Sequence, residues 1–195
     1  MPESGKNDVR ELIIQAAWNV FARFGFKKAA VDDIAEAAGK AKSSVYHYFK
    51  SKEEIFEIIV ERESNAFMEE ISNAVDGAGS PEDKIRAYVI TRIKRVLRLM
   101  NRHSGLKDVY LDHFGFIEKF RKVHDKKEVQ KVKEILQDGV KRGVFAGIDV
   151  DSLAELFVIS LKGLEYEWAN VGDFSEIEKT VNSNMDHLLY GIVKR

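Results

Sequence analysis

Residues 25–56, GFKKAAVDDIAEAAGKAKSSVYHYFKSKEEIF, hold two short amphipathic segments on either side of a glycine. The first segment, residues 31–38, repeats its apolar side chains at helical spacing and keeps its acidic side chains on the opposite face. Gly39 follows the last apolar position, where a helix commonly ends in a left-handed residue that glycine adopts without steric cost. After this turn, Val45 and Phe49 lie four residues apart and can face inward together. The stretch therefore predicts a helix-turn-helix.

The outer surface of the second helix of this motif is rich in hydrogen-bond donors. These residues are Lys42, Ser43, Ser44, Tyr46, His47 and Tyr48, with Lys40, Lys50 and Lys52 close by. Amine and hydroxyl donors on an exposed helix are suited to the phosphates and base edges of DNA. The alternative is that the tyrosines cover a core and the lysines form an ordinary solvated face.

At this spacing, the stretch resembles the DNA-binding region of the TetR (tetracycline repressor) family of bacterial transcription regulators. The resemblance covers residues 9–60 and is carried by Gly25, Val31, Ile34, Ala35, Ala38, Gly39, Lys42, Val45, Tyr46, Phe49, Ser51, Lys52 and Ile55. A second stretch is similar to the end of the seventh helix and the start of the eighth in that family. It contains Gly139, Gly143, Phe145, Asp149 and Ala154.

The chain departs from the family pattern at two places. Ala29 and Ala30 stand where threonine or serine is usual, and alanine cannot donate a hydroxyl to phosphate. Lys40 and Ala41 replace an apolar residue and a serine, so the second helix of the motif loses a side-chain N-cap, which Ser43 or Ser44 could supply instead.

The expected DNA contacts fall into two groups. Phosphate contacts, which fix the register without reading sequence, are expected from Tyr46, Tyr48, Lys52 and Lys28. Base-edge contacts are expected at the front of the helix, where it can enter the major groove. The residues predicted to make them are Lys42, Ser43, Ser44 and His47, and Lys40 adds a cation that has no usual counterpart in the family.

The composition fits a helical globular protein with one or two domains. The chain has 195 residues, of which 45% are hydrophobic and 32% charged, and it has two prolines. No run of alternating β-branched residues predicts a sheet. The net charge of −1 gives no overall basic balance, so the prediction of a DNA partner depends on where the lysines lie.

Several kinds of site and location are excluded or not expected. The absence of cysteine excludes disulfides and zinc fingers, and no metal or cofactor is expected. The start of the chain lacks the pattern of a secretory signal, and no stretch approaches the roughly 20 apolar residues of a membrane span. We therefore expect a cytoplasmic protein without a membrane partner.

The apolar periodicity predicts an all-α fold of about nine helices. Outside residues 25–51 they are expected over 7–24, 52–75, 81–104, 106–114, 116–142, 150–171 and 175–193. Residues 1–51 are predicted to form the DNA-binding domain. Residues 52–195 are predicted to form a helical domain for ligand binding and dimerisation.

A homodimer is expected because one small helix-turn-helix buries little surface on DNA, and specific binding needs two copies about 34–36 Å apart. The last two helices are predicted to form a four-helix bundle with those of a second copy. The interface residues would be Leu153, Leu156, Phe157, Ser160, Leu161, Leu164, Trp168, Val181, Met185, Leu188, Leu189 and Ile192. The alternative is that these stripes face the core of their own subunit.

The resemblance also implies a small-molecule effector, of unknown identity, that binds the C-terminal domain and changes the angle between the two DNA-binding heads. Aromatic walls with a few polar groups suit a largely apolar ligand, although each residue could equally be an ordinary core residue. The predicted pocket residues are Tyr88, Arg92, Tyr110, His113, Phe114, Phe120, Tyr166 and Trp168.

Two other functions compete with that of a DNA-binding regulator. A helical enzyme could use Glu165 and Glu167, or Asp112 with His113, but residues two apart do not share a helix face. The sequence has no nucleophile motif and no phosphate loop, so we expect no enzyme. An interaction module without DNA binding is favoured only by Ala29 and Ala30. The sequence as a whole favours a ligand-responsive regulator, expected to be a repressor, that binds a palindromic operator as a homodimer.

Overall fold

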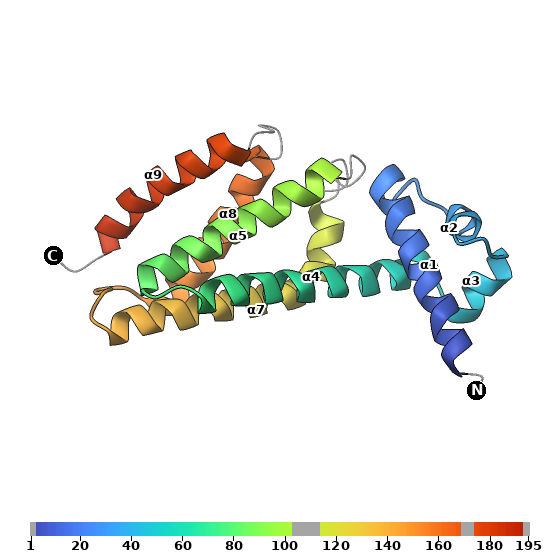
Figure 1. Cartoon of the computed structure of the whole chain (residues 1–195), viewed down its shortest axis with the longest axis horizontal. Coiled ribbons are helices and arrows are strands. Elements are labelled where there is room, and N and C mark those ends of the chain that lie inside the picture. The colour runs from blue at the N-terminus through green and yellow to red at the C-terminus, as the bar shows by residue number, and fades with distance from the viewer. Residues whose placement is uncertain (1–2, 103–113, 169–173, 193–195) are drawn as a thin grey trace. The chain divides into compact units, whose positions relative to one another are not determined.

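The computed structural model describes residues 3–102, 114–168 and 174–192. Within these ranges, side chains are described except at positions 3–6, 100–102, 114–124, 165–168, 174, 176, 188 and 190–192. The described residues form helices joined by turns and contain no strand (Figure 1). The helices are α1 (Glu3–Phe24), α2 (Val31–Ala37), α3 (Lys42–Tyr48), α4 (Lys52–Asp76), α5 (Pro81–Arg102), α7 (Phe114–Lys141), α8 (Val150–Trp168) and α9 (Phe174–Ile192). The prediction of an all-α fold is confirmed, while the helix expected over 106–114 lies almost entirely outside the described residues.

The first compact unit contains α1, α2, α3, α4 up to Glu63 and α7 up to Phe120. Phe21 of α1, Phe26 of the following turn and Phe56 of α4 pack ring against ring, with centroids 4.8 to 5.5 Å apart. The turns around this core need left-handed backbone, and Gly25 and Gly39 supply it with φ values of 75° and 60°. The predicted glycine turn between α2 and α3 is therefore present.

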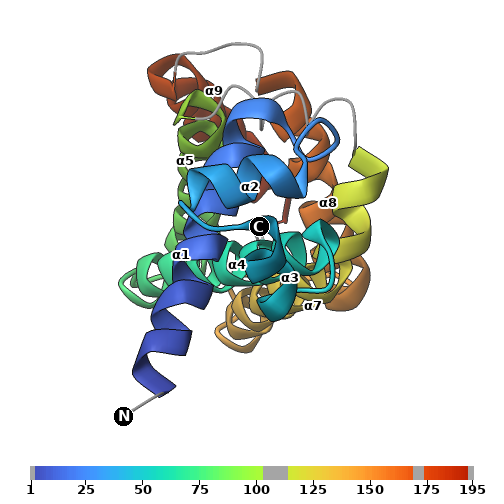
Figure 2. The same ribbon diagram turned by 90° about the vertical axis from the view of Figure 1, so that its right-hand side faces the viewer.

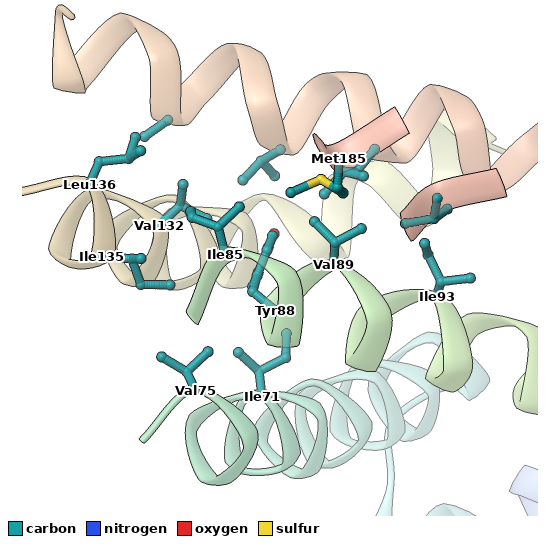
Figure 3. Packing of buried hydrophobic residues seen from close by; sticks show 14 of the residues in the cluster. Ile71, Val75, Ile85, Tyr88, Val89, Ile93, Val132, Ile135, Leu136 and Met185 are labelled. Atoms are coloured by element: carbon teal, nitrogen blue, oxygen red, sulfur yellow. The ribbon is translucent and has the colours of Figure 1, made fainter. Parts of the chain in front are cut away.

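The second compact unit contains α4 from Ser64 onward, α5, α7 from Arg121 onward, α8 and α9. Its core is largely aliphatic because each helix turns one apolar stripe inward. Figure 3 shows side chains from α4, α5, α7 and α9 pointing toward one another. They include Ile71, Val75, Ile85, Tyr88, Val89, Ile93, Val132, Ile135, Leu136 and Met185.

The division between the units falls inside helices, in α4 and again in α7. α4 is continuous from Lys52 to Asp76, and its residues belong to the first unit up to Glu63 and to the second from Ser64. The functional boundary expected between residues 51 and 52 stays a prediction. Among the described helices, none combines the length and the apolar character that a membrane crossing requires.

Candidate nucleic-acid interface

The α3 helix is fixed to the first unit by one side and exposed on the other. Val45 and Phe49 are buried in the core of this unit, and the guanidinium of Arg10 lies 5.2 Å from the centre of the Phe49 ring. Because these anchors are four residues apart, the rest of the helix surface faces outward. Lys42, Ser43, Tyr46 and His47 are exposed, and Ser44 and Tyr48 are partly buried. Figure 2 shows α3 beside α2 in this unit, and α2 contacts both α1 and α3.

The two alanines that depart from the family pattern have different surroundings. Ala29 is 2% exposed and belongs to the core of the first unit, whereas Ala30 is exposed and is the N-cap residue of α2. Its backbone N–H donates to a carboxylate oxygen of Asp33 at 2.7 Å. A side chain from inside the helix therefore satisfies the backbone donor just before α2, while Ala30 itself offers no side-chain acceptor.

The N-terminus of α3 also lacks a side-chain cap, because Ala41 is its N-cap residue. The expectation that Ser43 or Ser44 supplies the cap is wrong, since both lie inside the helix. The same helix end carries a cation, Lys42, whose ammonium donates to the carboxylate of Asp32 on α2 at 2.8 Å. Both groups are exposed, and the hydrogen bond to Asp32 is the main cause that raises the pKa of Lys42 above its ordinary value.

Lys52 has a position that the sequence pattern did not reveal. Its ammonium donates to the carbonyl oxygens of Phe26 and Ala29 at 2.9 Å and of Lys27 at 3.3 Å, and it lies 4.6 Å from the centre of the Phe26 ring. An ammonium has three N–H donors, and three carbonyls occupy them here. The expected phosphate contact of Lys52 does not fit this arrangement. The residue ties the start of α4 to the turn before α2.

Lys28 and Lys40 are exposed, and the structure leaves their predicted DNA contacts untested. Tyr46 is 50% exposed. The ring of His47 meets that of Tyr48 edge on, with centroids 5.1 Å apart. The structure thus brings Lys42, Ser43 and His47 to the exposed surface of one short helix, as the sequence predicted.

In the second unit, two of the predicted pocket residues share a buried polar cluster. The hydroxyl of Tyr88 donates to Glu128 at 2.7 Å, and the guanidinium of Arg92 forms an ion pair with the same carboxylate. Arg92 is 0% and Glu128 3% exposed, and the guanidinium lies 5.8 Å from the centre of the Phe67 ring on α4. This cluster joins α4, α5 and α7. Tyr110 and His113 lie outside the described residues, as do the side chains of Phe114, Phe120, Tyr166 and Trp168.

Glu128 was not among the predicted site residues, although the sequence carries a signal for it. It precedes Val132 by four positions and Ile135 by seven, so it occupies the apolar stripe of α7. An acidic residue in register with such a stripe indicates a buried carboxylate that needs a partner.

The residues predicted for the dimer interface divide into two groups. Leu161, Val181, Met185 and Leu189 are buried in the core of the second unit, and Leu153 and Phe157 are partly buried against it. Leu156 is 60% exposed, Leu164 43%, and Ser160 is exposed beside them. Ile159, which the sequence reasoning missed, is 65% exposed between them. The side chains of Trp168, Leu188 and Ile192 lie outside the described residues.

Within the described part of the chain, no group of three histidine or acidic side chains could hold a metal ion. Asp112 and His113 are outside the described residues, and so are the side chains of Glu165 and Glu167.

Known proteins are similar to the region that contains α2 and α3 and to the chain as a whole. The family model described as "Bacterial regulatory proteins, tetR family" matches residues 13–59, which span α2, α3 and parts of α1 and α4. The HTH-type transcriptional repressor KstR2 of Mycolicibacterium smegmatis is 29% identical over 193 residues, which cover 95% of this chain and 91% of the repressor.

Two solved structures have the same fold. The fatty acid degradation regulator FadR from Bacillus halodurans has a TM-score of 0.74 and 23% identity, covering 90% of this chain and 93% of FadR. The transcriptional regulator FadR from Bacillus subtilis, solved in complex with stearoyl-CoA, has a TM-score of 0.75 and 21% identity, covering 93% and 98% of the two chains. The relatives and neighbours are regulators, which agrees with the prediction that this chain is not an enzyme.

Proposed function

Because the chain belongs to the TetR family of bacterial transcription regulators, we propose that it represses transcription by binding a palindromic operator as a homodimer. The observation that carries this proposal is the surface of α3. Val45 and Phe49 hold the helix, and its outward side offers the donors of Lys42, Ser43 and His47. Donors on a short exposed helix can enter the major groove and reach base edges. Because a bacterial regulator acts on DNA in the cytoplasm, we propose this location for the protein.

The exposed apolar side chains of α8 support the dimer. Leu156, Ile159 and Leu164 recur at spacings of three and five residues, with exposed Ser160 and Gly163 among them. Apolar side chains that cluster on the surface of one helix commonly mark an interaction surface. A second copy that places the same surface against it would bury both and set the distance between the two α3 helices.

The effector is proposed to bind the second unit, whose core is mainly aliphatic and contains the buried polar cluster of Tyr88, Arg92 and Glu128. Similarity to the FadR that binds stearoyl-CoA supports a ligand with a long apolar part. Binding beside Phe67 or Ile71 would shift α4, and α4 runs without a break to Lys52. A changed α4 angle alters the spacing of the two heads, so the operator is released.

Selection from a library of random DNA duplexes tests the operator proposal. The wild-type protein is expected to enrich an inverted repeat, with affinity that falls steeply as salt rises because phosphate contacts release counterions. Lys42→Ala and His47→Ala should change which bases are enriched. Recovery of no preferred sequence would contradict DNA recognition.

Two further measurements test the dimer and the effector. Leu156→Glu should convert the dimer to a monomer in analytical ultracentrifugation and abolish binding to the inverted repeat, whereas Val140→Glu, at an exposed apolar site on α7, should do neither. Stearoyl-CoA should release the duplex, and free coenzyme A should not. Equal release by the two compounds would contradict an apolar effector.

A further inference from the structure

We propose that Asp32 determines the base specificity of α3 by holding the ammonium of Lys42 toward base edges and away from phosphates. The inference rests on the proposed function and adds to it a residue outside the recognition helix. Lys42 is a predicted base contact, whereas Asp32 lies on α2, whose acidic side chains were expected only to face solvent.

The two neighbouring acids at the start of α2 have different tasks. Asp33 accepts the backbone N–H of Ala30 at 2.7 Å and so serves the N-terminus of its own helix. Asp32 points to the next helix and accepts the ammonium of Lys42 at 2.8 Å. The two carboxylates therefore have separate partners, and Asp33 does not contact Lys42 in place of Asp32.

The position of Lys42 explains why a carboxylate is needed there. Lys42 is the first residue of α3, and the N-terminus of a helix carries partial positive charge that disfavours a cation. The first turn of α3 contains no acidic residue, so Asp32 supplies the negative charge from α2. Because both groups are exposed, their ion pair adds little to folding stability. Its effect lies in the direction that it gives to a flexible side chain.

This direction decides what Lys42 can contact on DNA. One of the three N–H donors is used by Asp32, which leaves two for the O6 and N7 acceptors of a guanine. The carboxylate also repels phosphate, so it penalises arrangements in which Lys42 leaves the groove for the backbone. Asp32 thereby weakens binding to unrelated DNA and strengthens the preference for a guanine at one position of each half-site.

The test compares Asp32→Asn with Glu36→Gln, because Glu36 is an exposed acid one turn further along the same helix. Both variants remove one negative charge. Affinity is measured for the duplex that the wild-type protein enriches and for a randomised duplex of the same length. Asp32→Asn should lower the ratio of the affinity for the enriched duplex to the affinity for the randomised duplex about tenfold. It should also relax the preference for guanine. Glu36→Gln should change the ratio by less than about twofold, because charge alone raises both affinities together.

Three outcomes would overturn the inference while leaving DNA recognition intact. The first is an unchanged ratio in Asp32→Asn, and the second is an equal change in Glu36→Gln. The third is a full effect of Asp32→Asn in a Lys42→Met background, where the residue that it positions is absent and no effect is expected. If the wild-type protein enriches no sequence at all, the proposed function fails and the inference falls with it.

Discussion

Phe145 lies so close to Gly139 that a Cβ atom at position 139 would stand 2.1 Å from Cδ2 of the ring. The chain reverses after α7 through Gly143, whose φ is 71°, and the backbone N–H groups of Val144 and Phe145 both donate to the carbonyl of Gly139. The ring is buried in the core of the second unit. Glycine at 139 is therefore a packing requirement, although it lies within a helix.

We predict that Gly139→Ala lowers the free energy of unfolding by about 1–3 kcal/mol, because overpacking outweighs the better helix propensity of alanine. Urea denaturation measures the change. Gly79→Ala is the control, since a Cβ atom there meets nothing within 4 Å, and it should be neutral. Adding Phe145→Leu to Gly139→Ala should recover part of the loss. An alanine variant as stable as the wild type would show that the ring can move aside freely.

Lys52→Met should destabilise the first unit by about 2 kcal/mol, because three carbonyls lose a charged donor. DNA affinity should fall for every sequence through disorder at the turn before α2. The slope of log affinity against log salt should stay unchanged, since no phosphate contact is lost.

The matched control is Lys28→Met, an exposed lysine on that turn. Its melting temperature should be unchanged, and its salt slope should fall by about 0.9 if it contacts phosphate. If Lys52→Met melted normally and had a reduced salt slope, the result would support the phosphate contact that the sequence predicted for Lys52.

Glu128→Leu should destabilise the second unit by about 3–5 kcal/mol, because it leaves the buried guanidinium of Arg92 without its carboxylate. The double variant Arg92→Met with Glu128→Leu should recover most of this loss, since neither charge is then buried. Chemical denaturation of the single and double variants gives the comparison. Equal instability of the two would mean that the ion pair does not couple these residues.

Asp149 should make stability depend on pH at acid values. Its carboxylate accepts the hydroxyl and backbone N–H of Ser152 and the N–H of Asp151, and these bonds lower its pKa below the ordinary value. The folded pKa lies below the unfolded one, so this stabilisation is complete above the unfolded pKa and is lost as pH falls through the folded value. Urea unfolding between about pH 6 and pH 3 should show wild-type stability approaching that of Asp149→Asn. A constant difference across this range would argue against the cap.

Local patterns predicted the helices because apolar spacing and glycine turns are encoded within a few residues. Gly39 and the stripe through Val45 and Phe49 are examples, and the structure places each as expected. Contacts between distant residues were not predictable in this way. Lys52 meets carbonyls 23 to 26 positions earlier, and Asp32 meets Lys42 across a turn. Nothing in the spacing of lysines distinguishes one that faces DNA from one that binds backbone.

The predicted dimer residues show the same limit. A continuous apolar stripe on α8 and α9 does not reveal which part faces the subunit's own core. Burial separates Val181 and Met185, which pack inside, from Leu156 and Leu164, which remain exposed. The predicted pocket contained Tyr88 and Arg92 but missed Glu128, because a charged residue in a helix is usually assigned to the solvent side.

The most direct test of the central claim uses the absence of cysteine from the chain. Ser43→Cys creates a single attachment point for an iron–EDTA cleavage reagent on the exposed surface of α3. On the enriched duplex, we predict two clusters of strand cleavage related by two-fold symmetry and about one helical turn, or a multiple of it, apart. The same reagent on Ser183→Cys, an exposed position of α9, should not produce these clusters. A single cluster, or identical cleavage from both attachment points, would contradict a pair of α3 helices lying in the groove of one operator.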